Sequence, residues 1–373
     1  MNSLFRTDGH STRYWRKLLA FDPVETFVLI HPADIALLRV FLHKYSDHLC
    51  AGYFSYDLGL ALHGIQSQHT SESPLAVFHA YRHWVEGEKK MPAMGGIGHD
   101  VHENPMLKFE ATVQRQNYKQ GINEIKNFIR AGDVYQINYT QQLKSEIDSS
   151  PRELYPSLLE RHPADYACFF EHADKAIHSL SPELFLHYKD GILSTEPIKG
   201  TRPRGTTPAE DTAQKMALLG SEKEQAELFM ITDLLRNDLG KICEIGSVSL
   251  KAIKQLHQLP KVWHTSSRIS GNVRSGLAPL DALISMLPGG SISGCPKKRA
   301  LEIIDALEIS SRGIYTGSLG YFHPDGDFSF NIAIRTLVQE GRNIKLGTGG
   351  GITIDSNWEA EWEEILVKAS TFM

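Results

Sequence analysis

One lysine stands where its amine could do chemistry. Lys199 lies in the segment 197–201 (PIKGT), directly after an apolar stretch and before the turn-forming segment 202–205 (RPRG). A lysine among small residues can present its amine to a cleft, although most lysines are simply solvated at the surface. Elsewhere the chain carries spaced carboxylates and two glycine-rich segments. One amine with several carboxylates and exposed backbone N–H groups suits a small polyanion bound through a metal ion.

Carboxylates at helical spacing occur near the end of the sequence. Glu361, Glu364 and Lys368 are spaced i, i+3 and i+7, so they share one face of the helix predicted over 358–369. Spacing alone fits a surface ion pair between Glu364 and Lys368 as well as a ligand site. Glu227 lies among apolar residues one turn inside another predicted helix, where we expect it to be half-buried. Carboxylates from two distant helices suit Mg²⁺, a hard cation that prefers oxygen ligands.

Two glycine-rich segments offer backbone groups to a ligand. The segment 288–294 (PGGSISG) leads into a helix that opens with Lys297, so we expect its N–H groups and this ammonium to attract a carboxylate or phosphate; a simple tight turn is the alternative. The segment 347–351 (GTGGG) follows a predicted strand, where missing side chains let a ligand approach the backbone. Arg335, expected inside an apolar strand, is costly to bury unless it meets a carboxylate.

The sequence contains two incomplete nucleotide-binding motifs and no motif of a serine hydrolase. Gly289 and Gly294 have Walker spacing, but Cys295 stands where that motif requires lysine. The segment 347–351 begins like a dinucleotide fingerprint and then has Ile352 in place of the final glycine. The sequence has no GxSxG nucleophile elbow. A nucleotide enzyme is therefore disfavoured.

Composition places the chain among ordinary globular proteins. Its 373 residues are 41% hydrophobic and 22% charged, which supports a large buried core. The net charge of −5, without a run of basic residues, gives no support to nucleic-acid binding. We expect no membrane span, because no stretch approaches ~20 apolar residues, and no signal peptide. The four cysteines are scattered without a CxxC pair, so the expected location is the cytoplasm.

Hydrophobic periodicity predicts strands and helices without regular alternation, which favours an α+β fold. Helices are expected over about 114–132, after Ser150, from Ser221 to about 239, after Pro296, and over 358–369. Strands are expected over 134–143, 167–170, 177–181, a hairpin at 184–195, 248–250 and 263–269. Three neighbouring antiparallel strands are expected over 314–322, 328–338 and 344–347.

The pattern along the chain changes near residue 105. Residues 1–105 carry short apolar runs that predict strands and a helix or two, and 86–105 resembles a loop or linker. Residues 106–373 carry the clearer periodicity and every candidate residue named so far. We expect 106–373 to form the catalytic domain, and 1–105 to belong to the same large α+β unit.

Several segments, in this order, resemble the chorismate-utilising enzymes. They are SPELF, PIKGT, EL-FMITDLLRNDLG, VWHTSS, PGGSISGCPKKRALEII, RGIYTGSLGYF, NIAIRT and GTGGGITIDSN-EAEWEE. The resemblance is strong from about Gln114 onward and weaker before it, where GYFSYDLG at 52–59 is the only clear piece. It implies two packed antiparallel β-sheets with outer helices and an active site in the cleft between them.

The resemblance also implies a metal site for the ring carboxylate of chorismate. Glu227 and Glu364 would hold Mg²⁺, which binds that carboxylate, and Glu361 would lie beside the metal through water. Further contacts to the ring carboxylate would come from Gly349, Gly350 and Lys368.

The remaining candidates acquire roles from the same resemblance. Tyr315 and Arg335 would bind the enolpyruvyl carboxylate, and Thr201 would also contact the substrate. Glu183 would act as general acid on the departing C4 hydroxyl, and His264 would line the same side of the site.

Two positions separate the sub-families in this resemblance. Lys199 occurs as lysine in aminodeoxychorismate synthases, whereas anthranilate synthases resemble PIAGT, with alanine. At Gln136, isochorismate and salicylate synthases carry a lysine that activates water, so glutamine argues against water as the nucleophile. The chain also lacks a Leu-Leu-Glu-Ser stretch of the kind that binds tryptophan in anthranilate synthases. The segments are most similar to aminodeoxychorismate synthase component I, with anthranilate synthase component I as the close relative.

We therefore expect an Mg²⁺-dependent enzyme that converts chorismate and ammonia to 4-amino-4-deoxychorismate, for p-aminobenzoate and folate, through a covalent intermediate on Lys199. The sequence has no glutaminase-like Cys/His segment, so ammonia would come from a glutamine amidotransferase partner. The alternatives are anthranilate synthase component I and a non-catalytic sensor that binds a dicarboxylate. A sensor needs neither the acid Glu183 nor the nucleophile Lys199, which disfavours that class.

Overall fold

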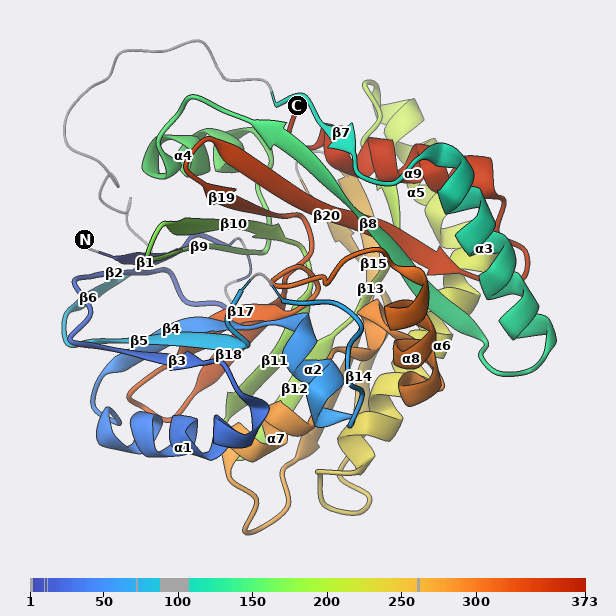
Figure 1. Ribbon diagram of the computed structural model, residues 1–373. Coiled ribbons are helices and arrows are strands. Elements are labelled where there is room, and N and C mark those ends of the chain that lie inside the picture. Colours follow the sequence, from blue (N-terminus) through green and yellow to red (C-terminus); the bar gives the residue numbers. More distant parts are fainter. Residues whose placement is uncertain (1–2, 10, 12, 72, 88–106, 260–261) are drawn as a thin grey trace.

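The computed structural model arranges the chain as two antiparallel β-sheets with helices on their outer sides (Figure 1). It describes residues 3–9, 11, 13–71, 73–87, 107–259 and 262–373. Sheet A has the strand order β16-β8-β20-β19-β10-β9-β1-β2-β6, with β7 beside β8. Its strands are β1 (Leu4–Thr7), β2 (Leu18–Phe21), β6 (Trp84–Glu86), β7 (Glu110–Ala111), β8 (Gln136–Glu146), β9 (Tyr166–His172), β10 (Lys175–Ser181), β16 (Gly294–Cys295), β19 (Thr336–Glu340) and β20 (Asn343–Ile352).

Sheet B has the strand order β13-β15-β12-β11-β18-β17-β4-β5-β3, with β14 beside β15. Its strands are β3 (Glu25–Leu29), β4 (Leu49–Phe54), β5 (Ala76–Tyr81), β11 (Leu184–Lys189), β12 (Ile192–Glu196), β13 (Ile198–Pro203), β14 (Ser249–Gln258), β15 (Val262–Asn272), β17 (Ser318–Phe322) and β18 (Phe328–Ile332). The expected fold of two antiparallel sheets with outer helices is confirmed.

Helices cover the outer faces of both sheets. On sheet A, α4 packs against β10, while α3 and α9 pack against each other and against β20. On sheet B, α1 packs on β3, and α5 and α6 pack on β13 and β15. The helices are α1 (Ile35–Lys44), α2 (Tyr56–Leu62), α3 (Arg115–Arg130), α4 (Pro151–Arg161), α5 (Pro208–Gly220), α6 (Glu222–Gly240), α7 (Pro279–Ser285), α8 (Lys297–Leu307) and α9 (Trp358–Ser370), with short 3-10 turns η1 (Pro32–Asp34) and η2 (Gly290–Ile292).

Buried aromatic and aliphatic residues join the inner faces of the sheets. This cluster draws on both sheets and includes Phe5, Trp15, Tyr53, Phe170, Leu184 and Tyr321. Strands β1 and β2 lie in sheet A and β3 to β5 in sheet B, so the region before residue 105 contributes to both sheets. The predicted boundary at 105 itself lies outside the described residues.

Local sequence signals account for most helix boundaries. Ser150 forms a capping box with Glu153 at the start of α4, and Pro151 occupies the first turn. Ser221 caps α6 as predicted, because its hydroxyl accepts a hydrogen bond from the N–H of Glu224. Helix α5 was not predicted, although Thr207 and Glu210 form a capping box at its start.

The predicted continuous strand over 328–338 is wrong. Its first part is β18 of sheet B and its second part begins β19 of sheet A, so the chain crosses between the sheets over residues 333–335. Arg335 lies in this crossing rather than inside a strand, and its φ of 48° is rare for a residue with a Cβ. Apolar residues continue through the crossing, so the hydrophobic pattern does not reveal the break.

The glycine-rich segment 347–351 lies within β20, where a strand end was predicted. Strand β20 continues to Ile352, and Gly349 and Gly351 pair with Thr140 and Asn138 of β8. A Cβ at Gly349 would approach the Tyr139 carbonyl oxygen to 2.2 Å, so only glycine fits this close pairing.

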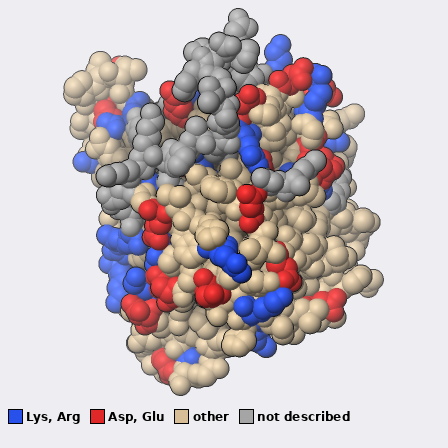
Figure 2. All heavy atoms as spheres, turned by 90° about the vertical axis from the view of Figure 1, so that its left-hand side faces the viewer, with Lys and Arg blue, Asp and Glu red and all other residues tan. Residues whose placement is uncertain are grey.

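The surface carries charges of both signs. On the face shown in Figure 2, Lys and Arg side chains lie next to Asp and Glu side chains. Across the described ranges, no helix is long and apolar enough to cross a membrane.

The aromatic cluster around Phe330 gives a prediction about stability. Its ring is fully buried and lies 5.1 Å from Phe322 and 5.7 Å from Phe54. We expect Phe330→Ala to lower the free energy of unfolding by about 3–5 kcal/mol, because it leaves a cavity. Urea denaturation measures this change. Phe229→Ala is the control, since Phe229 is 44% exposed, and a similar loss from both variants would contradict the prediction.

Candidate active site

Strands β13 and β15 position Lys199, Thr201 and His264. In their pairing, Lys199 lies opposite Thr265 and Thr201 opposite His264, with an irregularity at Gly200. Gly200 has a φ of 78°, which a residue with a Cβ rarely adopts. An irregularity of this kind bends a strand and redirects its side chains. The turn-like composition around the lysine therefore corresponds to a bulge in a strand beside the helices α5 and α6.

Glu183 lies in a buried position between β10 and β11, close to Lys199. Its side chain is 5% exposed, and burial raises its pKa to about 7. A hydrogen bond from Ser291 and the positive charge of Lys199 act in the opposite direction and are weaker. A carboxyl group with this pKa is poised to act as a general acid near neutral pH. The predicted acid and the predicted nucleophile thus lie within electrostatic reach of each other.

Helix α9 presents Glu361, Glu364 and Lys368 to the glycine-rich strand β20. A Cβ at Gly350 would lie 3.1 Å from Glu361 Oε2 and 3.9 Å from Glu364 Oε1, so the missing side chain leaves room beside both carboxylates. Lys368 Nζ lies 2.7 Å from Glu364 and donates a 2.7 Å hydrogen bond to the Gly349 carbonyl. The surface pair suggested by spacing therefore exists, and it stands at the predicted ligand site.

Charge and burial affect the two α9 carboxyl groups differently. Burial raises the pKa of Glu361, and the charge of Glu364 adds to that rise. Burial also raises the pKa of Glu364, but Lys368 and then Lys199 outweigh it, so the net shift is downward. The action of Lys199 on Glu364 links β13 to α9 across the site.

Helix α6 supplies a further pair of carboxylates. Glu227 is half-buried as expected, and its Oε1 lies 4.0 Å from Lys223 Nζ. Glu224, one turn earlier, was not singled out from the sequence, and its side chain pairs with Arg202 at 2.9 Å. Burial raises the pKa of Glu224, and the charge of Glu227 contributes to that rise. The i, i+3 spacing of Glu224 and Glu227 was the signal that sequence reasoning missed.

The carboxylates of α6 and α9 suit a divalent cation in their chemistry. They offer only hard oxygen donors, and Lys223 acts electrostatically on both α9 groups from α6. Within the described part of the chain, no three His, Cys, Asp or Glu side chains yet converge as a metal site. Two ammonium groups, Lys223 and Lys368, accompany the carboxylates. The donor set and the space at Gly350 fit Mg²⁺.

Arg335 and His264 form a second part of the site. Burial lowers the pKa of Arg335, and no carboxylate of the described residues lies within ion-pair distance of its guanidinium. Burial, together with the smaller effects of the nearby His257 and Arg335, lowers the pKa of His264 to about 3. His264 is therefore neutral at physiological pH, beside a cation that remains available to an anionic ligand.

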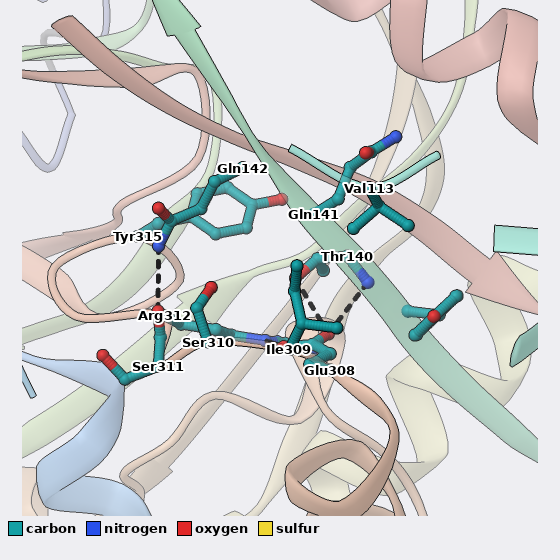
Figure 3. A pocket seen from close by; sticks show the side chains of 11 residues that line it. Val113, Thr140, Gln141, Gln142, Glu308, Ile309, Ser310, Ser311, Arg312 and Tyr315 are labelled. Atoms are coloured by element: carbon teal, nitrogen blue, oxygen red, sulfur yellow. Dashed lines mark hydrogen bonds and ion pairs between the residues drawn. The ribbon is translucent and has the colours of Figure 1, made fainter. Parts of the chain in front are cut away.

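Tyr315 packs against the glycine-rich strand from the other side. A Cβ at Gly347 would come within 2.1 Å of the Tyr315 ring, whereas Gly350 faces the α9 carboxylates. Positions 347 and 350 point to opposite faces because side chains alternate along a strand. Burial raises the pKa of Tyr315. Figure 3 shows Tyr315 at a narrow cavity that Gln141, Glu308 and Arg312 also line.

Ser291 of the glycine-rich loop 288–294 belongs to the site. Lys297, which follows this loop at the start of α8, does not. Lys297 Nζ lies 2.6 Å from Asp238 and donates to the Pro288 carbonyl, so its charge is already compensated. The expectation that Lys297 would attract an anionic ligand is therefore wrong. Sequence reasoning did not single out Ser291, because a serine between glycines carries no signal of its own.

Two cavities adjoin these residues. One of about 320 Å³ is lined by His264, by Pro182 next to Glu183, and by Ile198 next to Lys199. The other, of about 780 Å³, is lined by Tyr315, by Gly347 and by Thr336 next to Arg335. Of the predicted site residues, His264 lines the first cavity and Tyr315 lines the second.

Comparison with known proteins identifies the family. The model of the chorismate binding enzyme family matches residues 5–373, so the chain belongs to this family. Anthranilate synthase component 1 of Pseudomonas aeruginosa is 39% identical over 260 residues, or 70% of this chain and 53% of that protein. Aminodeoxychorismate synthase component 1 of Bacillus subtilis is 38% identical over 261 residues, or 70% of this chain and 56% of that protein.

The structural comparison agrees with the family. Anthranilate synthase component I from Streptococcus pneumoniae TIGR4 superposes with a TM-score of 0.81 and 26% identity, covering 97% of this chain and 93% of that chain. The chain spans about half the length of the two bacterial relatives named above. Identity alone does not separate the two kinds of synthase, because both match to nearly the same degree.

The raised pKa of Glu183 gives a prediction about stability and pH. The folded state favours the protonated carboxyl, so stability is lost as pH rises from about 4.5 through about 7. We expect Glu183→Gln to escape this loss and to exceed the wild type by about 3 kcal/mol at pH 8, with little difference at pH 4. Denaturation at a series of pH values measures the change. Glu363→Gln, at a 60% exposed position, should leave the profile unchanged; parallel curves for wild type and Glu183→Gln would show that the carboxyl is not shifted.

Proposed function

We propose that the protein converts chorismate and ammonia to 4-amino-4-deoxychorismate, a precursor of p-aminobenzoate and folate. The observation that carries the proposal is the lysine at position 199, beside the buried acid Glu183 and within electrostatic reach of Glu364. In the resemblance drawn from the sequence, aminodeoxychorismate synthases carry this lysine and anthranilate synthases carry alanine. The match to aminodeoxychorismate synthase component 1 of Bacillus subtilis is consistent with it.

Substrate binding divides between the two parts of the site. The enolpyruvyl carboxylate would meet Arg335, whose guanidinium has no carboxylate partner among the described residues, and Tyr315. The ring carboxylate would lie at Gly350 beside α9, with Lys368 nearby. Mg²⁺ held by Glu227 and Glu364, with Glu361 through water, would neutralise this carboxylate when bound. Thr201, opposite His264 in the β13–β15 pairing, would contact the substrate from β13.

The chemistry assigned to the chain's own residues has two displacements. The neutral amine of Lys199 forms a bond to C2, both ring double bonds shift, and the C4–O bond breaks; the second displacement reverses these shifts. The Glu183 carboxyl gives its proton to the departing hydroxyl, which leaves as water. Ammonia then bonds to C4, the C2–N bond breaks, and its electron pair returns to Lys199. The new ammonium at C4 gives a proton to the Glu183 carboxylate, which restores the acid.

Ammonia must reach this site from outside. We propose a separate glutamine amidotransferase as its source in the cell, since the sequence contains no glutaminase-like Cys/His segment. Anthranilate synthase component I is the second candidate function, because its named relatives are equally similar.

An assay of products tests the proposal. The protein, chorismate, Mg²⁺ and ammonium at pH about 8 should give 4-amino-4-deoxychorismate, which keeps the enolpyruvyl group, while anthranilate would appear with pyruvate. Lys199→Ala should lose most of the 4-amino product and the covalent adduct that mass spectrometry detects on the peptide containing Lys199. Lys199→Arg is the matched control, because it keeps the charge but is no nucleophile. Wild-type 4-amination by Lys199→Ala would remove the proposed role.

Removal of a metal-binding carboxylate gives a second test. Glu227→Gln or Glu364→Gln should lower turnover by ~10²–10⁴-fold, because a neutral amide binds Mg²⁺ poorly. Both should also weaken Mg²⁺ binding measured by calorimetry without unfolding the protein. Glu363→Gln on the same helix is the control, since its side chain is 60% exposed and pairs with Arg115. If Glu364→Gln keeps wild-type turnover at limiting Mg²⁺, Glu361 takes over as the candidate ligand.

A further inference from the structure

A buried ion pair lies beside the narrow cavity of Figure 3. Arg312 donates to Glu308 through Nε (2.8 Å) and Nη2 (2.7 Å), in the bidentate geometry that suits a guanidinium and a carboxylate. The two side chains are only 2% and 6% exposed. Neither residue has a role in the function proposed above.

The remaining donors of Arg312 reach segments far apart in the sequence. Nη1 donates to the Ile292 carbonyl at 2.9 Å and lies 3.4 Å from the Thr316 hydroxyl oxygen. Nη2 donates to the Asn138 carbonyl at 2.6 Å. One guanidinium thus connects the glycine-rich loop 288–294, the segment around Thr316 and strand β8.

Glu308 extends the same network. Its Oε1 accepts hydrogen bonds from both the backbone N–H and the hydroxyl of Thr140, each at 2.8 Å. The pair therefore fixes β8 at two points, Asn138 through Arg312 and Thr140 through Glu308. Figure 3 shows Glu308 and Thr140 side by side, joined by dashed lines.

Each anchored residue adjoins a residue of the candidate site. The neighbours are Ile292 with Ser291, Thr316 with Tyr315, Thr140 with Gly349, and Asn138 with Gly351. Ser291 in turn acts on Glu183, because its hydroxyl lowers the pKa of that carboxyl. The ion pair thus reaches the tyrosine and the glycine-rich strand through one anchored residue each, and the acid through Ile292 and then Ser291.

We infer that the Arg312–Glu308 pair is a positioning element that fixes Ser291, Tyr315 and the glycine-rich strand relative to one another. This inference rests on the proposed function, because it concerns the same site. A buried ion pair need not add stability, since the desolvation of two charges offsets their attraction. Its several bonds to separate backbone segments are better explained by the geometry that they impose.

The effect on Glu183 is the measurable consequence. Ser291 stabilises the charged form of Glu183 and so lowers its pKa. The charge of Lys199 on β13 also lowers the pKa of Glu183. If the Ile292 carbonyl loses its anchor, Ser291 shifts and its stabilising effect on the charged form of Glu183 is lost. The carboxyl of Glu183 should then titrate at higher pH than in the wild type.

Arg312→Lys tests the inference, because lysine keeps the charge but its single ammonium group cannot reproduce the five contacts of the guanidinium. In ligand-free protein labelled with ¹³C-glutamate, we expect the carboxyl signal of Glu183, assigned with Glu183→Gln, to titrate at higher pH. Ser291→Ala should shift it in the same direction, and the double variant should shift it no further. With chorismate, Arg312→Lys should lower kcat/KM on the order of 10²-fold.

Arg152→Lys is the matched control. It makes the same arginine-to-lysine change in another ion pair, Arg152–Glu171 (2.7 Å), which joins α4 to β9. It should leave the Glu183 titration unchanged. An unshifted titration in Arg312→Lys, or shifts that simply add in the double variant, would overturn the inference. If Arg312→Lys fails to fold, Thr140→Val removes the hydroxyl donor alone; it should lower kcat/KM, and Thr140→Ser should restore it.

The two readouts separate this inference from the proposed function. The titration needs no turnover, and kcat/KM is taken from chorismate consumption whichever amino product forms. A wild type that makes anthranilate would therefore contradict the proposed product, while the titration and kcat/KM of Arg312→Lys would still decide the positioning role.

Discussion

The three-residue crossing from sheet B to sheet A is the constraint on which the site depends. At this crossing, the Ile332 N–H donates to the Glu183 carbonyl, and the Leu180 N–H donates to the Arg335 carbonyl. The Thr316 N–H donates to the Ala333 carbonyl, and the Ala333 N–H to the Gly317 carbonyl. The backbones that carry the acid, the arginine and the tyrosine are thus bonded to one short segment. Buried backbone groups must be paired, so this segment cannot move without all three.

The positions of charge follow from this arrangement. The acid and the arginine lie where burial favours their neutral forms, since it raises the pKa of Glu183 and lowers that of Arg335. Glu227 and Glu364 are less enclosed, with side chains 20% and 53% exposed, and ammonium groups accompany them. An anionic ligand would pair directly with Arg335 and would need a cation to approach the carboxylates of α6 and α9. This asymmetry is the physical reason for expecting a metal on one side of the substrate only.

Sequence reasoning recovered the elements with local signals and missed those decided by tertiary contacts. Caps and periodicity placed α3, α4, α6, α8 and α9 within a few residues, because these signals reside in adjacent positions. The break at Ala333 and the pairing of Lys297 with Asp238 depend on partners far away in the chain. Ser291 was missed for the same reason, since only the fold brings it to Glu183. Glu308 and Arg312 are four residues apart, so their spacing was a local signal that went unread. The roles of individual site residues came from family resemblance, which periodicity and spacing could not have supplied.

The contact between Gly347 and Tyr315 has a consequence for how this protein can evolve. The tyrosine ring occupies the space in which any side chain at 347 would begin. Replacement of Gly347 by a larger residue is therefore tolerated only if a smaller residue already replaces Tyr315. A smaller residue at position 315 leaves a cavity until position 347 carries a side chain. Neither step is neutral alone, so lineages should change the two positions together or keep both. This coupling should keep tyrosine at position 315 even when other residues of the cavity wall are substituted.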